Sequence, residues 1–205
     1  MRNKFGMTLA SLTVVGMLQV GGCSPLTFPI SFDLVGANLG TFGVQAGEPE
    51  TVSGALTFDN TTGIEVGSGD LEISPESISI TPTPTGSGKF APTAQEVNNC
   101  LDACNLAGVD AAVCSDVCEN NQLRVTVWIG TSETIAVACE NGDEYVFDVT
   151  LDDNGQATSV SVTPAQMTQA TVDLFNSGAF GICVEVISPI DGTVVIDTLT
   201  ANVGL

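Results

Sequence analysis

The sequence contains no histidine, and only four of its 205 residues are Lys or Arg, against 24 Asp and Glu. Without histidine, the chain lacks the usual general base of hydrolytic triads and the commonest side-chain ligand of transition metals. Because basic residues are so few, it also lacks the positive surface that binds phosphate backbones, which excludes nucleic acid as a partner. Hydrophobic residues, at 43%, are sufficient for the core of one globular domain.

The first 22 residues have the order of a secretory signal. Two basic residues, Arg2 and Lys4, precede an uncharged and mostly apolar run from Phe5 to Val20. This run is short for a helix that stays in a membrane as a permanent span. We therefore expect residues 1–22 to be a signal peptide that is removed.

The leader ends in Val20, Gly21 and Gly22, directly before Cys23, and this arrangement resembles the lipobox of bacterial lipoproteins. Most family members have Leu at the first of these positions and Ala or Ser at the second. The resemblance covers residues 1–23 and implies cleavage before Cys23 and lipidation of that cysteine, with palmitate among the acyl chains. Gram-negative lipoproteins kept in the inner membrane have Asp after the cysteine, so Ser24 implies the outer membrane.

This leader sets the expected domain organisation. Residues 1–22 are the lipoprotein signal peptide, 23–26 a lipidated tether, and 27–205 a single β-rich domain that faces the periplasm or the cell surface. The acyl chains supply the membrane contact, which leaves the domain itself in water. The mature chain then keeps two basic residues, Lys89 and Arg124, against 24 acidic ones, a net charge of −22.

From Leu26 onward, short apolar or alternating runs are interrupted about every eight to twelve residues by Gly, Asn, Asp or Pro, as in β proteins. Asn-Gly and Asp-Gly pairs at 141–142, 154–155 and 191–192 have the turn chemistry of hairpins, and the pattern predicts a three-stranded meander over 134–162. The expected strands are Phe28–Val35, Val52–Phe58, Asp70–Ile73, Ser77–Ile80, Leu123–Ile129, Thr134–Cys139, Glu144–Leu151, Ala157–Val162, Gly181–Ile187 and Thr193–Leu199.

Two regions have helical signals. A capping box over 93–96 begins a helix that extends to about Gly108, and Asp110 caps a second helix that ends near Asn120. Thr163 followed by Pro164 predicts the start of another helix, which ends at Gly178. The expected fold is therefore mostly β: an antiparallel β-sandwich or barrel-like sheet with a helical hairpin inserted at about 93–120 and one packing helix at about 164–176.

Four cysteines form two CxxxC pairs separated by nine residues: Cys100, Cys104, Cys114 and Cys118. In an antiparallel helical hairpin with its turn at Val109, residues equidistant from the turn lie opposite each other. This spacing predicts the disulfides Cys104–Cys114 and Cys100–Cys118. A zinc site held by the four thiolates is the alternative, but an exported chain meets an oxidising compartment, which favours disulfides.

The twin CxxxC segment over 100–118 resembles the disulfide-linked helical hairpins of the α-hairpinin type, which have this spacing and nested pairing. Basic members of that family are inhibitory or antimicrobial, whereas this segment has acidic residues and no basic one, so no activity is carried over. Of the seven cysteines, lipidation of Cys23 leaves six to pair. Elimination then predicts a third disulfide, Cys139–Cys183.

The sequence contains no arrangement of residues that is typical of a catalytic site. Lys89, the single lysine of the mature chain, lies in a Pro- and Gly-rich connector without a Ser-x-x-Lys frame. We therefore expect no enzymatic activity and no cofactor. The kind of enzymatic activity that the sequence still allows is one that depends on carboxylates or on a metal.

Calcium is the metal that the residue types allow, because it needs only oxygen ligands. The candidate ligands are Asp148, Asp152, Asp153 and Asn154, around a predicted hairpin turn. An EF-hand loop needs alternating ligands and a Glu at its twelfth position, and this stretch has neither. An acidic turn in solvent is the simpler interpretation, so no metal site is predicted.

The sequence leaves several functions open. The leading hypothesis is a lipid-anchored protein of the cell envelope that acts as a non-catalytic binding or structural module. Its expected partners are the outer membrane, through the lipid, and cationic or envelope proteins. One alternative is a carrier whose β core encloses an apolar or cationic small molecule. Another is a calcium-dependent adhesion or hydrolase domain.

Overall fold

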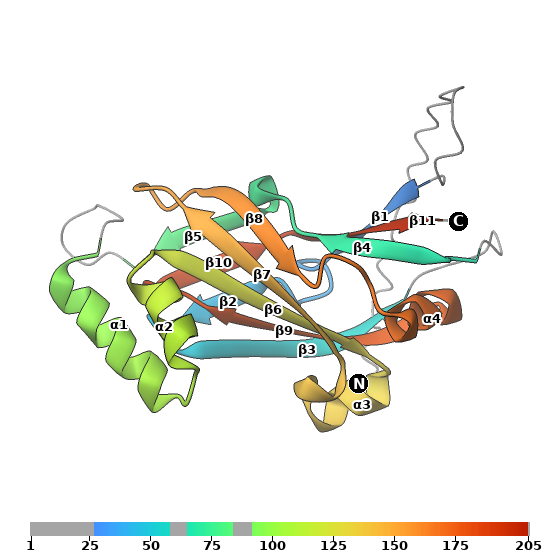
Figure 1. Cartoon of the computed structure of the whole chain (residues 1–205), viewed down its shortest axis with the longest axis horizontal. Coiled ribbons are helices and arrows are strands. Elements are labelled where there is room, and N and C mark those ends of the chain that lie inside the picture. Colours follow the sequence, from blue (N-terminus) through green and yellow to red (C-terminus); the bar gives the residue numbers. More distant parts are fainter. Residues whose placement is uncertain (1–26, 58–64, 84–91, 205) are drawn as a thin grey trace, which may run out of the picture.

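The computed structural model, which describes residues 27–57, 65–83 and 92–204, has two layers of antiparallel strands that face each other (Figure 1). One layer is a five-stranded sheet. Its strands, in spatial order, are β3 (Pro49–Thr57), β9 (Ala179–Ile187), β6 (Gln122–Gly130), β7 (Asp143–Leu151) and β8 (Ala157–Thr163).

The other layer consists of two three-stranded sheets built from the same three chain segments. One sheet has the order β1 (Thr27–Asp33), β11 (Thr198–Gly204) and β4 (Ser68–Glu72); the other has β2 (Thr41–Val44), β10 (Gly192–Ile196) and β5 (Ile78–Pro82). The segments bend between their two strands. At the bend, the Leu34 N–H donates to the Asp197 carbonyl, and the Asp197 N–H donates to the Ser77 carbonyl, at 2.9 and 2.8 Å. The single strand predicted over 193–199 is therefore two strands.

The core fills the space between the layers, and strand alternation explains its composition. Inward-facing residues of the central strands, such as Val127 and Phe147, are completely buried. The Phe32 ring packs edge-on against Phe175 and Phe180, with centroids 5.6 and 5.5 Å away. The predicted mostly β, antiparallel fold is confirmed, and its form is the sandwich. In the described part of the chain, no sheet closes into a barrel.

Helices lie at both ends of the sandwich (Figure 1). One end carries α1 (Ala94–Leu106) and α2 (Ala111–Cys118), and the other carries α3 (Ser132–Val137) and α4 (Gln169–Ser177). The predicted caps of the first two helices are confirmed, since Thr93 and Glu96 form a capping box and Asp110 accepts from the Ala112 N–H at 2.8 Å. Among the described residues, no helix is both long and apolar enough to cross a membrane.

The strand predicted over 134–139 is wrong, because these residues belong to α3 and to the short 3-10 helix η2 (Cys139–Asn141). Thr131 accepts from the Thr134 N–H and caps α3, and only Ile135 of this helix is buried. A three-stranded meander does form, but it consists of β6, β7 and β8, so its first strand is β6 and not the expected strand over 134–139. Its second turn is confirmed, since Gly155 has a positive φ of 77° between β7 and β8.

The predicted start of the helix at 163–164 is also wrong. Thr163 continues β8 and pairs with Val146, so the Thr-Pro step lies at the end of a strand. The helix α4 begins at Gln169, where Thr168 accepts from the Thr171 N–H, and it ends at Gly178 as predicted. The sequence did not reveal the strand β2, the part of β11 beyond Leu199, the helix α3 or the short 3-10 helices.

Candidate functional site

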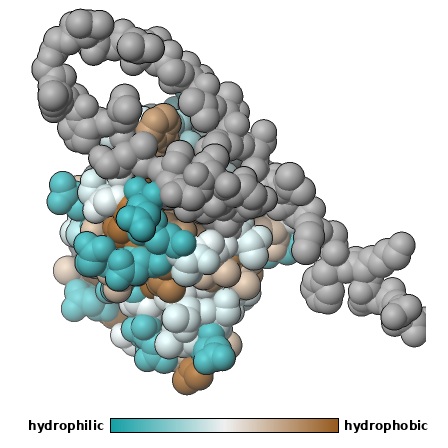
Figure 2. All heavy atoms as spheres, turned by 90° about the vertical axis from the view of Figure 1, so that its right-hand side faces the viewer, coloured by the Kyte–Doolittle hydropathy of each residue, from teal (hydrophilic) through white to brown (hydrophobic). Residues whose placement is uncertain are grey.

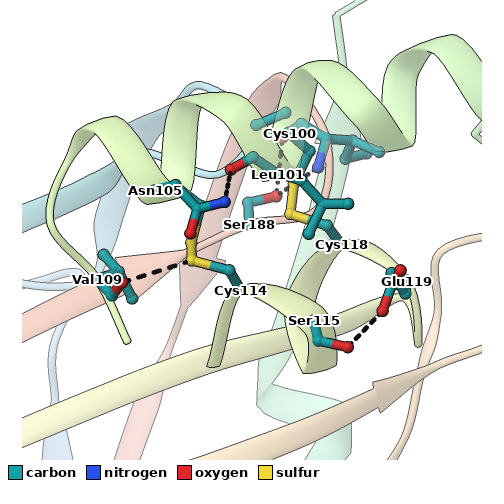
Figure 3. The surroundings of a disulfide bond; sticks show 12 residues. Cys100, Leu101, Asn105, Val109, Cys114, Ser115, Cys118, Glu119 and Ser188 are labelled. Atoms are coloured by element: carbon teal, nitrogen blue, oxygen red, sulfur yellow. Dashed lines mark hydrogen bonds between the residues drawn. A yellow bond between two sulfur atoms is a disulfide. The ribbon is translucent and has the colours of Figure 1, made fainter. Parts of the chain in front are cut away.

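Two disulfides hold α1 and α2 together, and α1 of this helical pair forms one wall of the candidate site. Cys100 is bonded to Cys118 and Cys104 to Cys114, with Cα atoms 5.8 and 5.7 Å apart. These are the pairs that the twin CxxxC spacing predicts. Figure 3 shows both bonds between the helices, with Ser188 of the sandwich beside Cys100.

The helical pair is docked onto the sandwich by a small apolar cluster and by one glycine. The four cysteines and Val117 pack against Ile187 at the end of β9. Gly47, in the turn between β2 and β3, lies so close to α1 that a Cβ built on it would be 2.2 Å from the Cys100 carbonyl oxygen. Its φ of 79° is also in the left-handed region, which favours glycine. Its N–H donates to the Ser188 carbonyl at 2.9 Å, so this turn is held on two sides.

A groove runs along α1 beside this turn. It has two adjoining lobes, of about 260 and 660 Å³, which share Glu48, Asn99 and Ala103. The first lobe continues to Glu96 and to the segment that precedes β10, including Asp191. The second lobe also contains Pro49, Asp102, Leu106 and Ala107. We call these two lobes the α1 groove.

Four carboxylates line the α1 groove: Glu48, Glu96, Asp102 and Asp191. No Lys or Arg is present among the described residues that line it. Carboxylates that no described lining residue compensates create a negative potential along the groove, and the low-dielectric walls focus it. The groove is therefore suited to a cationic ligand.

Two of these carboxylates also hold the walls in place. The Glu96 carboxylate accepts from the Thr93 N–H at 2.6 Å, and its hydrogen bonds with the Thr93 backbone and side chain lower its pKa below the ordinary value. The Asp191 carboxylate accepts from the Ala46 N–H at 2.8 Å. The side-chain carboxylates of Glu48 and Asp102 have no hydrogen bond to another described residue.

The calcium candidates from the sequence do not form a shared site in the structure. Asp148 pairs with Arg124 at 2.9 Å. Asp152 accepts from the N–H groups of Asn154 and Gln156, both at 2.8 Å, and these bonds stabilise the turn. Hydrogen bonds to its own turn, that from Gln156 first, lower the pKa of Asp152. Asp153 is exposed, and in the described part of the chain no three His, Cys, Asp or Glu side chains are grouped to hold a metal.

The third disulfide lies at the opposite end of the sandwich. Cys139 of η2 is bonded to the buried Cys183 of β9, which is the pair that elimination predicts. Trp128 and Ile135 pack around this bond, which attaches α3 to the outer face of the sheet. Cys23, the predicted lipidation site, and Lys89 lie outside the described residues.

A second cavity, of about 400 Å³, lies at this opposite end between α3 and α4. Its Asp143 accepts hydrogen bonds from Thr168 and Thr171 at the start of α4, and the buried Tyr145 hydroxyl donates to Thr171 at 2.9 Å. These bonds give Asp143 a structural role. On the part of this end drawn in colour, hydrophilic and hydrophobic residues are interspersed (Figure 2).

No protein family matches the chain, and no curated protein or solved structure is similar enough to count as a match. The interpretation of the α1 groove therefore depends on its own residues. The sequence did not predict this groove, because its four carboxylates come from three separate segments of a chain in which acidic residues are abundant everywhere.

Proposed function

We propose that the protein is a lipid-anchored, non-catalytic binding module of the cell envelope, and that its α1 groove binds a cationic segment of a partner. The lipobox-like leader supports the anchor. The observation that supports the ligand class is the set of four carboxylates in a groove that has no basic residue among its described lining. The module faces the periplasm or the cell surface, and its partner is in the same location.

The dimensions of the groove favour a short extended peptide. From Glu96 to Leu106, α1 rises about 15 Å, because each helical residue adds about 1.5 Å. An extended chain rises about 3.3 Å per residue, so four or five residues span the groove. Leu106, which is 88% exposed at the far end, offers an apolar contact to the aliphatic stem of a lysine or arginine.

The packed interior favours this module over the carrier. The facing sides of the two layers are filled by large side chains, such as Phe32, Phe175 and Phe180, that contact one another directly. The α1 groove, in contrast, is at the surface. A cationic ligand therefore has a groove to bind at the surface, whereas the ligand of a carrier would need space inside the packed β core.

The ligand proposal is tested by calorimetric titration of pentalysine into the full chain at low ionic strength. The test variant is Glu48→Gln with Asp102→Asn, because these carboxylates have no hydrogen bond to another described residue. The control variant, Glu65→Gln with Glu133→Gln, removes the same charge from exposed positions away from α1. We expect the test variant to bind at least about tenfold more weakly, a loss of about 1.4 kcal/mol, and the control to bind like wild type. Equal losses in both variants would show a nonspecific effect of net charge.

The anchor is tested separately by palmitate labelling and membrane sedimentation in a Gram-negative host. Cys23→Ser should abolish incorporation of the label and release the protein from the membrane fraction, because acyl chains supply the attachment. Retention of the label in this variant would contradict the anchor and leave the groove proposal intact.

A further inference from the structure

The strand β8 is an edge strand with an unusual composition for its position. Among the described residues it pairs with β7 alone, and its sequence, ATSVSVT, contains neither a charge nor a proline. Exposed edges pair with other strands unless charged residues, proline or short length prevent it. The other edge strands have such protection: Pro29 and Asp33 in β1, Glu50 in β3, Asp70 and Glu72 in β4, Pro82 in β5, and a length of four residues in β2.

The side chains of β8 are also incompletely covered. Val160 and Val162 face the core and pack against it, but both are only partly buried, whereas Val149 and Phe147 beside them on β7 are completely buried. The outward-facing Ser159 and Ser161 are exposed. The 3-10 helix η1 (Pro75–Ser77) approaches β8, but no backbone hydrogen bond joins the two among the described residues. An added strand would bury the exposed parts of both valines.

The strand β8 itself has no charge in a strongly acidic chain; the carboxylates around it are Glu76 of η1, Asp152 and Asp153 in the turn before it, and one in the neighbouring strand. The carboxylate nearest to it in the sheet is Asp148, which lies opposite Ser161. Arg124, the one basic residue in the described part of the chain, lies opposite Asp148 on its other side and pairs with it at 2.9 Å. The single described positive charge therefore neutralises the carboxylate that lies in the sheet directly beside β8.

We propose that β8 is a docking edge for a second copy of this chain, which adds its own β8 in the antiparallel direction. A second copy is the favoured occupant because two highly anionic chains repel each other least along an uncharged strand, and β8, beside the Arg124–Asp148 pair, is the edge strand without a charge or proline that is long enough to pair.

The antiparallel direction follows from the charges at the two ends of β8. The strand begins after the acidic turn of Asp152 and Asp153 and is followed by the uncharged segment 164–168. Antiparallel pairing places each acidic turn beside the uncharged segment of the other copy. Parallel pairing would place the two acidic turns side by side, where like charges repel.

The test is sedimentation velocity of the full chain with intact disulfides, from low to high micromolar concentration and at low and high NaCl. Wild type should change from monomer to dimer with rising concentration. Amide hydrogen exchange of the peptide covering 157–163 should slow in the dimer, while exchange in β5 stays unchanged. Added salt should strengthen the dimer, because it screens the repulsion between the two acidic chains.

The blocking variant is Ser159→Asp with Ser161→Asp, which places four new carboxylates at the interface of two copies. Like charges opposite each other in a sheet each cost up to about 1 kcal/mol, so the dimer should weaken by at least about tenfold. Ser79→Asp with Thr81→Asp makes the same change on exposed residues of the edge strand β5 and should dimerise like wild type. A chain that stays monomeric at every concentration, or a dimer that survives the blocking variant, would overturn the proposal.

A second pair of variants tests the role of the ion pair. Arg124→Gln leaves Asp148 unneutralised beside β8 and should weaken the dimer, whereas Arg124→Gln with Asp148→Asn removes both charges and should restore it. An equal effect of both variants would contradict the assigned role of Arg124. A dimer that forms only when pentalysine is present would instead indicate association through the α1 groove, which also overturns the proposal.

Discussion

Gly47 shows how one residue determines the position of the helical pair. A Cβ at this position would meet the Cys100 carbonyl oxygen at 2.2 Å, whereas Gly108, with nearly the same φ, has no atom within 4 Å of its Cβ position. Gly108→Ala should therefore cost only the backbone strain, about 1–2 kcal/mol. Gly47→Ala should cost about 1–3 kcal/mol more, because α1 must also move. Urea denaturation of both variants measures the difference, and equal losses would mean that the contact with α1 is unimportant.

Glu185 makes stability depend on pH. It is half-buried on the outer face of the interior strand β9, and this burial raises its pKa above the ordinary value of 4.5; the charges of Glu140 and Glu144 also raise it, and a hydrogen bond with Thr51 opposes the shift. A raised pKa means that the folded state favours the protonated carboxyl. This contribution to stability is complete below about pH 4.5 and is lost as the pH rises through the folded-state pKa.

The substitution Glu185→Gln should therefore raise the melting temperature at neutral pH, because glutamine cannot ionise. The gain over wild type should decrease as the pH is lowered and disappear below about 4.5. Thermal melts across this pH range check the prediction, with the exposed Glu65→Gln as control. A gain that does not vary with pH would show that ionisation of Glu185 is not the cause.

At the scale of elements, the disulfides stabilise the two ends of the sandwich separately: two bonds join α1 to α2 at one end, and the third lies at the other end. Replacing Cys100, Cys104, Cys114 and Cys118 by Ala should separate α1 from α2 and weaken pentalysine binding, with a loss of about 2–4 kcal/mol of stability per bond. Cys139→Ala with Cys183→Ala should also lower stability but leave pentalysine binding unchanged, since this bond lies at the other end. Calorimetry of the two variants distinguishes them, and equal loss of binding would contradict a groove held by the helical pair.

The elements that the sequence predicts correctly are those whose signal is local. Alternation marks β6 and β7, a capping box marks α1, and cysteine spacing relative to a turn predicts the two nested disulfides. The failures occur where tertiary contacts override the local pattern. The run that ends at Cys139 has β-like composition, but it folds as α3, in which Thr131 supplies the cap and Ile135 is the buried residue.

At the scale of the whole molecule, charge determines what the two surfaces can bind. The α1 groove and the β8 edge should respond to salt in opposite ways. Added NaCl should weaken pentalysine binding, because it screens attraction, and strengthen self-association, because it screens repulsion. Binding and sedimentation measured on the same preparation at several salt concentrations check this prediction. If added NaCl changed pentalysine binding and self-association in the same direction, both would use one surface.

The α1 groove itself could not be predicted from the sequence, because it exists only after folding. Glu48 follows β2, Asp102 is on α1, and Asp191 precedes β10, and only the docking of the helical pair brings them together. In a chain with 24 acidic residues, no local signal distinguishes these carboxylates from those in solvent. For the same reason, the sequence does not distinguish Glu185 from other acidic residues, because its burial arises only when the sheet forms.

The most direct test of the central claim is to map where a cationic peptide lies on the folded protein. Carbodiimide joins a lysine amine to a carboxylate that it contacts, with loss of water, and peptide mass spectrometry identifies the carboxylate. With pentalysine and the full chain, we expect the cross-links to concentrate on Glu48 and Asp102, and to be lost from both when excess N-acetylated pentaarginine, a cation without an amine to couple, competes for the groove. Cross-links spread evenly over exposed carboxylates such as Asp70, Glu72 and Glu133 would contradict a specific cation-binding groove.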